Sequence, residues 1–238
     1  MLTADTVRRP TRPQLEATAP FMSTKAAPSA ALPRLRRSES EDVRRRQMIE
    51  ATIDAIAEVG FSAAAIHQIA RRAGVSTGLV AFYFGDKDGL LEATLRHLAS
   101  QLRASMLEHL AAETSARGRI CAVIESTLGE SQFERRIATV WLAFWGQVPV
   151  VPRFARVQRV YERRMISNLT FGFAALLPER AALRLATATA AMIDGLWLRA
   201  ALSTDPPNSR AARAMVTAFV DSQLAQARLA FGASNSPP

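Results

Sequence analysis

IHQIARRAGVSTGLVAFYFGDK, residues 66–87, is the stretch that decides the fold expected for this chain. From Ile66 to Ala73, apolar residues recur at the i, i+3, i+4, i+7 spacing that gives a short helix one apolar face. Gly74 can adopt the left-handed conformation that ends a helix, and Ser76 can cap the helix that follows. The pattern predicts either a helix-turn-helix, whose second helix enters the DNA major groove, or an ordinary corner between two helices.

The residues that follow favour the DNA-binding alternative. Asp86 can cap a third helix and place Lys87 in its first turn, where the helix dipole prefers an acid. A cation at that position indicates an external anion such as a DNA phosphate. The run Gln68–Ser76, followed by Tyr83, Phe84 and Lys87, resembles the DNA-binding domain of the TetR family of bacterial repressors.

That resemblance and the helical register together give the candidate DNA contacts. The register turns Val80 and Phe84 inward and leaves the rest of the second helix for the groove, while basic residues near the start of helix 1 would meet the phosphate backbone. Two departures from the family pattern are Ala81, where a phosphate-binding tyrosine is common, and the Ala64-Ala65 pair, where a Ser or Thr cap is usual. The arginines and His67 could instead simply face solvent. The predicted contacts are Arg44, Arg45, Arg46, His67, Ser76, Thr77, Gly78, Leu79, Phe82, Tyr83 and Lys87.

Composition agrees with an all-α protein that binds a polyanion. The chain has 238 residues, 49% of them hydrophobic, and a net charge of +9. The single cysteine fits a reducing cytoplasm, and no run of about 18 apolar residues indicates a membrane span. Residues 1–37 hold seven basic residues against two acidic ones and are rich in Pro, Ala and Ser, so we expect a disordered basic extension. It either follows the DNA backbone or is inert.

Periodicity divides the remainder into helices. Helix 1 is expected to begin near Ser38 or Ser40 and to end at Gly60, and a long amphipathic helix is expected from Leu90 to His109. Further helices are expected over residues 119–129, 132–146, 179–203 and 209–231. The predicted domains are a helix-turn-helix head over residues 38–91, a ligand-binding and dimerisation domain over 92–231, and a disordered tail over 232–238.

Aromatic residues mark the second informative region. Trp141, Phe144 and Trp145 recur at i, i+3 and i+4, so they are expected on one helix face. Asp194 and Trp197 lie in a later apolar helix, where an unpaired acid is costly. These residues form either an ordinary core or a box for an organic cation, because aromatic faces attract quaternary ammonium groups. The predicted ligand site comprises Trp141, Phe144, Trp145, Asp194 and Trp197.

From Arg44 to Arg228 the chain resembles the choline-responsive members of the TetR family. The resemblance implies a cytoplasmic, nucleoid-associated homodimer that binds a palindromic double-stranded operator, represses genes for synthesis of the osmoprotectant glycine betaine, and responds to choline. We expect no cofactor, no metal, since His97 and His109 lack a ligand spacing, and no enzyme activity, since nucleophile and base are not clustered. Alternatives are a TetR-family repressor with another effector and a sequence-indifferent architectural DNA binder.

Overall fold

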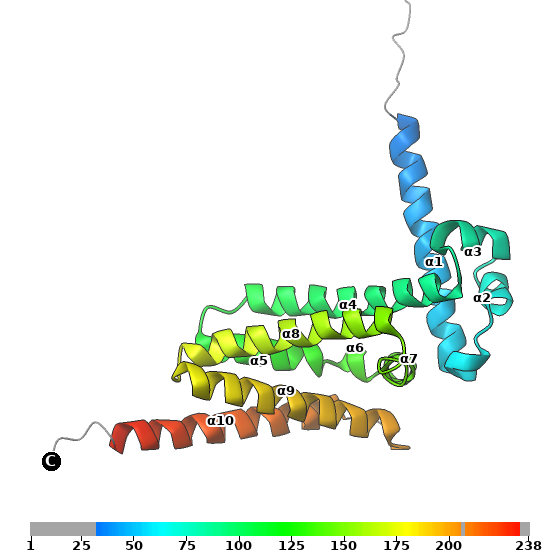
Figure 1. The fold of residues 1–238 in the computed structure, drawn as a ribbon. Helices are drawn as coiled ribbons and strands as arrows, with labels where there is room; N and C mark the ends of the chain where they lie inside the picture. Colours follow the sequence, from blue (N-terminus) through cyan, green and yellow to red (C-terminus); the bar gives the residue numbers. More distant parts are fainter. Residues whose placement is uncertain (1–31, 206–207, 234–238) are drawn as a thin grey trace, which may run out of the picture. The chain divides into compact units, whose positions relative to one another are not determined.

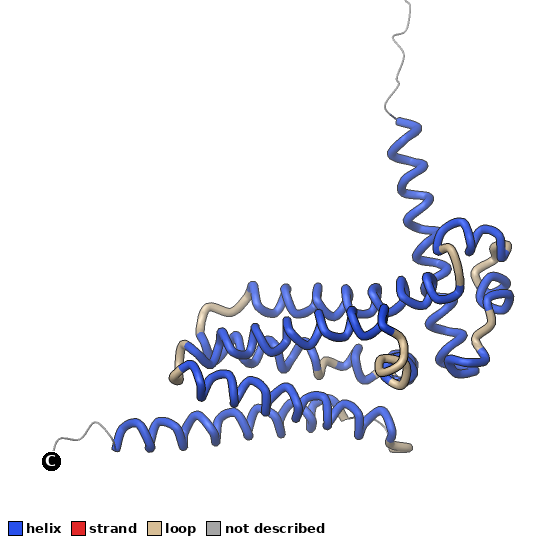
Figure 2. Tube along the Cα trace, viewed as in Figure 1, coloured by secondary structure: helices blue, strands red, loops and turns tan. Residues whose placement is uncertain are grey.

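The computed structural model describes residues 32–205 and 208–233, and side chains are described for residues 40–205 and 208–229. The described residues form α-helices and no strands (Figure 2). The chain divides into two compact units, residues 1–39 and 40–238, and the account below concerns the second. The helices are α1 Leu32–Ala63, α2 Ile66–Arg72, α3 Thr77–Phe84, α4 Lys87–Ala111, α5 Ala116–Thr127, α6 Glu130–Phe133, α7 Arg135–Trp145, α8 Pro152–Ala174, α9 Glu179–Leu202 and α10 Ser209–Ala233.

The predicted helix-turn-helix is confirmed in α2 and α3. Gly74 has a φ of 66°, which is the left-handed conformation expected after α2. The Ser76 hydroxyl accepts the Leu79 N–H at 3.1 Å and so caps α3. Asp86 caps α4 in the same way, since its carboxylate accepts the Gly89 N–H at 2.6 Å. Local capping therefore fixes the starts of α3 and α4, and Gly85, with a φ of 80°, follows the last residue of α3.

Helix α1 differs from the sequence prediction at its start. It begins at Leu32, so Ser38 and Ser40 lie inside the helix and not at its cap. No Gly or Pro occurs from residue 34 to residue 59, and nothing therefore stops the helix before Gly60, where φ is 81°. Residues 32–37 of the predicted disordered extension are helical, whereas residues 1–31 lie outside the described residues.

The C-terminal part is a stack of long helices (Figure 1). Helix α8 packs against α4, α5 and α9, and α10 packs against α9 and α5. The predicted helices over 179–203 and 209–231 are confirmed as α9 and α10, and Gly232 and Ala233 of the predicted tail belong to α10. Residues 234–238 lie outside the described part. The segment predicted as one helix over 132–146 is divided at Glu134, whose ψ of 127° separates α6 from α7.

Helix α9 is long and apolar enough, by length and composition alone, to cross a membrane. One face of α9 packs in the stack, because Ala182, Ala186, Ala190 and Ile193 are buried and α9 contacts α8, α10 and α7. A core helix of this kind passes the same test as a membrane span. We therefore interpret α9 as a central helix of the C-terminal domain.

Candidate functional site

The exposed face of α3 carries the predicted groove contacts. Val80 is fully buried and Phe84 packs partly on the core, as the register predicted. Thr77 and Gly78 are exposed, and the Phe82 side chain is 79% exposed although it is large and apolar. Leu79 and Tyr83 are half-buried. The α3 surface thus presents small polar and large apolar groups side by side.

Arg45 has a structural task that the sequence did not reveal. Its guanidinium donates to the Tyr83 carbonyl at 2.9 Å and lies 4.6 Å from the centre of the Phe84 ring. These contacts hold the C-terminal end of α3 on α1. The neighbouring residues Arg44 and Arg46 are exposed. The predicted arginine cluster therefore separates into one side chain that positions α3 and two that face outward.

The remaining predicted DNA contacts lie at the starts of α2, α3 and α4. His67 is exposed in the first turn of α2, and Ser76 is exposed at the α3 cap. At the α2 start, where no side chain caps the helix, the Gln68 side chain accepts the Ala65 N–H at 3.4 Å. Lys87 is half-buried in the first turn of α4 and forms no ion pair with any described residue. This leaves its ammonium group available to an external anion.

Helices α4 to α9 enclose a small cavity in the C-terminal domain. Its volume is about 20 Å³, which is enough for about one water molecule. All three tryptophans of the chain contribute to its wall, as does Asp194, the half-buried acid that the sequence singled out. The lining residues are Leu102, Thr127, Gln132, Trp141, Trp145, Tyr161, Ile193, Asp194 and Trp197.

The aromatic rings around the cavity lie in two pairs. The Trp145 and Trp197 ring centres lie 4.8 Å apart, and those of Trp141 and Tyr161 lie 6.1 Å apart. The Trp197 indole N–H donates to the Gln132 carbonyl at 3.0 Å. The Trp145 indole nitrogen is buried without a hydrogen-bond partner among the described residues. An unpaired buried donor of this kind is costly and is available to a ligand oxygen.

Asp194 supplies an acid to the same cavity. Burial raises the pKa of its carboxyl group to about 6, and the nearby charge of Glu162 acts in the same direction. Burial also raises the pKa of the Tyr161 hydroxyl, and the Asp194 charge adds to that effect. No described Lys, Arg or His forms an ion pair with Asp194. A bound cation would therefore give this carboxylate the partner that the protein does not provide.

Phe144 differs from its predicted neighbours and does not line the cavity. Its ring is fully buried and makes edge contacts with Phe61 at 5.5 Å and Phe154 at 5.4 Å between ring centres. The three rings join α7 to α1 and α8. Phe144 is accordingly a core residue between the head and the C-terminal domain, and we leave it out of the ligand site.

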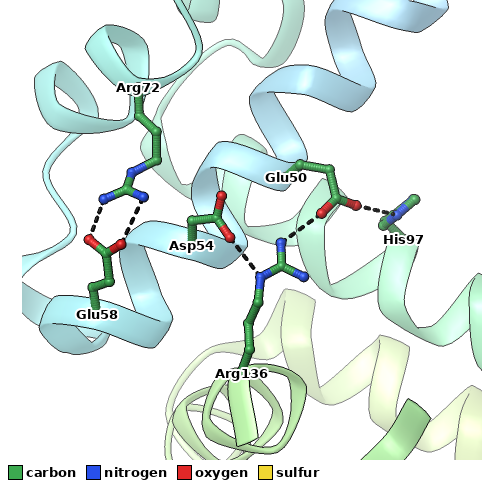
Figure 3. A network of polar contacts seen from close by, with 6 residues as sticks. All are labelled: Glu50, Asp54, Glu58, Arg72, His97 and Arg136. Carbon is green, nitrogen blue, oxygen red and sulfur yellow. Dashed lines mark hydrogen bonds and ion pairs between the residues drawn. The ribbon is translucent and has the colours of Figure 1, made fainter. Parts of the chain in front are cut away.

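A polar network joins α7 to α1 and α4 (Figure 3). Arg136 of α7 donates to Asp54 at 2.6 Å and to Glu50 at 2.8 Å, and both acids lie on α1. The His97 ring of α4 lies 3.4 Å from the other Glu50 oxygen. Within the head, Arg72 of α2 pairs with Glu58 of α1. Helix α7 therefore contacts the head through both charged and aromatic side chains.

Comparison with known proteins places these features among transcriptional regulators. Residues 48–94 match the family described as bacterial regulatory proteins, tetR family, and residues 116–225 match the BetI-type transcriptional repressor C-terminal family. The HTH-type transcriptional regulator BetI of Klebsiella pneumoniae (strain 342) is 46% identical over 186 residues, which are 77% of this chain and 95% of that protein. BetI of Escherichia coli (strain K12 / DH10B) is 45% identical over the same shares.

Solved structures show the same fold. A putative transcriptional regulator from Pseudomonas aeruginosa PAO1 superposes with a TM-score of 0.70 at 26% identity, over 80% of this chain and 94% of that one. A putative transcriptional regulator from Saccharomonospora viridis in complex with choline superposes with a TM-score of 0.65 at 22% identity, over 76% of this chain and 96% of that one.

Proposed function

Because this chain belongs to the TetR family and is a BetI-like transcriptional repressor, not an enzyme, we propose that it represses choline-to-glycine-betaine genes and releases them when choline enters the tryptophan cavity. The observation that carries the proposal is the chemistry of that cavity. Three tryptophans, an unpaired carboxylate and an unpaired indole N–H meet there. The trimethylammonium group of choline is complementary to the rings and the carboxylate, and its hydroxyl group is complementary to the indole N–H.

A trimethylammonium group donates no strong N–H hydrogen bond, so a protein holds it by ring faces and by charge. Trp141, Trp145 and Trp197 supply the faces, and Asp194 supplies the charge. The hydroxyl oxygen of choline would accept the free N–H of Trp145. The choline complex of the structural relative from Saccharomonospora viridis supports this choice of effector.

The size of the cavity suggests how binding is coupled to DNA. A space for about one water molecule is too small for a trimethylammonium group, so the surrounding helices must separate when choline binds. Helix α7 carries two of the lining tryptophans and also holds α1 through Arg136 and Phe144. Choline would thus favour an arrangement in which the heads no longer match the operator, provided that it binds that arrangement more tightly.

For DNA binding, we assign the exposed face of α3 to the groove. Gly78 supports this assignment, because a Cβ placed there would meet only the Ser76 hydroxyl at 3.8 Å. The fold therefore does not require glycine, whereas a close approach to DNA would. Thr77 and Phe82 lie beside it and contact base edges in our proposal. Ser76, Leu79, Tyr83 and His67 remain candidate contacts at the edges of this surface.

Phosphate contacts fall to the exposed cations around α3. Arg44 and Arg46 face outward from α1, and Lys87 lies in the first turn of α4. Arg45 acts through α3 in our proposal, because its guanidinium is engaged with Tyr83 and Phe84. Such contacts set the position of the head on DNA and carry little sequence information themselves.

A two-fold operator requires a two-fold protein, and we propose a homodimer formed through α9 and α10. Large apolar side chains are exposed on both helices. Leu202 is 65% exposed and Leu229 is 76% exposed, and Leu183 and Met215 are about half exposed. A partner copy would cover this surface. We further propose that the dimer is associated with the nucleoid in the bacterial cytoplasm.

The effector is tested by titrating choline into the full-length protein while intrinsic tryptophan emission and operator affinity are recorded. We expect a saturable change in emission and a loss of operator binding. Trp145→Leu should weaken choline binding about two- to thirtyfold, the value of one cation–π contact. Phe171→Leu, on the exposed side of α8, is the matched control and should leave the dissociation constant unchanged.

If choline changes neither emission nor operator affinity in the parent protein, the tryptophans are core residues and the effector is another small molecule. An architectural DNA binder predicts a different outcome. In that case, removal of residues 1–37 would abolish DNA binding, whereas a helix-turn-helix repressor would keep its operator preference without them.

A further inference from the structure

A second and larger cavity lies outside the tryptophan cavity, in a groove between α4 and α8. Its volume is about 680 Å³. The floor is apolar and includes Met106 and Val157, which are buried, and Val160 and Leu107, which are 41% and 49% exposed. A monomer that leaves such side chains in contact with water has a surface suited to an apolar partner.

The rim of this groove is strongly basic. Arg96 and Arg103 contribute from α4, and Arg156 and Arg164 contribute from α8. No Asp or Glu lines the groove. Arg96 is paired with Glu92 at 2.8 Å, but the other three guanidinium groups form no ion pair with any described residue. Like charges gathered at one groove repel each other, and an anion in the groove would relieve that repulsion.

Helical spacing arranges the two kinds of side chain along the groove. On α8, Arg156, Val160 and Arg164 follow one another at four-residue intervals, so they lie one turn apart on a single face. On α4, Arg103 and Leu107 have the same spacing. Each wall thus alternates a cation with an apolar side chain. An occupant complementary to both walls has an apolar body and an acidic head.

We propose that this groove is a binding site for a small amphipathic anion, whose alkyl body lies on Val157, Val160 and Leu107 and whose carboxylate or phosphate head is held by Arg103 and Arg164. The guanidinium fork donates two parallel hydrogen bonds to either head group. The site is distinct from the tryptophan cavity, although Leu102 and Tyr161 line both. The proposal holds whether or not choline is the effector.

The test is calorimetric titration of the full-length protein with decanoate and, separately, with decyl phosphate. We expect saturable binding of at least one of the two, with one site per chain, and the stronger of the two identifies the preferred head group. Acetate, which lacks the body, and decanol, which has the body but no charge, should bind at least tenfold more weakly. Equal binding of decanol would mean apolar adsorption and would overturn the proposal.

Paired variants separate the groove from general surface charge. Arg103→Gln with Arg164→Gln should weaken binding about tenfold or more, since both charge-assisted contacts with the head are lost. Arg159→Gln with Arg163→Gln removes the same charge from exposed positions of α8 that do not line the groove, and should have no effect. Equal losses in the two double variants, or no saturable binding to the parent protein, would contradict the proposal. Choline binding that is unchanged in both double variants would show that the tryptophan cavity is intact.

Discussion

Arg136→Gln should uncouple the head from the C-terminal domain in part. The guanidinium is the one group of the network that bridges α7 and α1, through Asp54 at 2.6 Å and Glu50 at 2.8 Å (Figure 3). Glutamine retains much of the side-chain length but cannot form either ion pair. The aromatic contact of Phe144 with Phe61 is untouched, so the variant should fold.

The expected loss of operator affinity depends on how far the two ion pairs are exposed to water. The Arg136, Glu50 and Asp54 side chains are 38%, 40% and 37% exposed, so water screens both pairs. Screened pairs contribute about 0.2–1 kcal/mol each, and together about 1 kcal/mol, which is roughly a fivefold change in an equilibrium constant. In the proposed function, the arrangement with the small tryptophan cavity is the ligand-free one that binds DNA, and these contacts belong to it. Their loss should therefore weaken operator binding about two- to tenfold.

The assay is fluorescence anisotropy of labelled operator, with and without choline. Arg136→Gln should bind the operator more weakly. It should also release DNA at a lower choline concentration, because less free energy opposes the conversion to the choline-bound arrangement. Arg135→Gln is the matched control, since this neighbour donates only to the Ser203 carbonyl at the end of α9. Asp54→Asn should add little to Arg136→Gln in a double-mutant cycle. Operator affinity and choline response equal to the parent values would refute the coupling.

Three further predictions concern the DNA-binding surface and the tryptophan cavity. Lys87→Ala should weaken operator and random DNA by similar factors and reduce the salt slope by about one unit, and an unchanged slope would refute a phosphate contact. Thr77→Ala should alter preference among operator variants, whereas equal loss on every sequence would argue against base contact. Choline affinity should fall below pH 6, by about tenfold at pH 5, where about one tenth of Asp194 would be ionised. Asp194→Asn should bind weakly at every pH, and a pH profile like that of the parent would exclude Asp194.

The head was predictable because local chemistry determines it. Gly74, Ser76 and Asp86 each act within three or four residues of their own position, through a positive φ or a cap. Such signals are read directly from sequence, and all three were confirmed. The start of α1 was not predictable in this way. A serine can cap a helix or lie within one, and the residues before Ser38 are compatible with helix.

Long-range contacts explain what the sequence left open. Arg45 was predicted only as a DNA contact, because its partner Tyr83 lies 38 residues away and offers a main-chain carbonyl that no motif reveals. Arg136 and Glu50 are 86 residues apart and occur in ordinary charged positions. The groove between α4 and α8 was missed because four arginines look like solvated charges until two distant helices bring them together. No helix was predicted over residues 152–174, so the α8 side of the groove was not expected.

Phe144 shows that residues on one helix face can meet different neighbours. Spacing of i, i+3 and i+4 places Trp141, Phe144 and Trp145 on one side of α7, but that side meets more than one neighbour. The tryptophans meet the cavity with α8 and α9, whereas Phe144 enters the cluster with Phe61 of α1. The division has a physical consequence. In the proposed function, a ligand that displaces α7 at the tryptophans would also displace the Phe144 ring and the Arg136 guanidinium, which contact α1, so α7 would couple the ligand to the head.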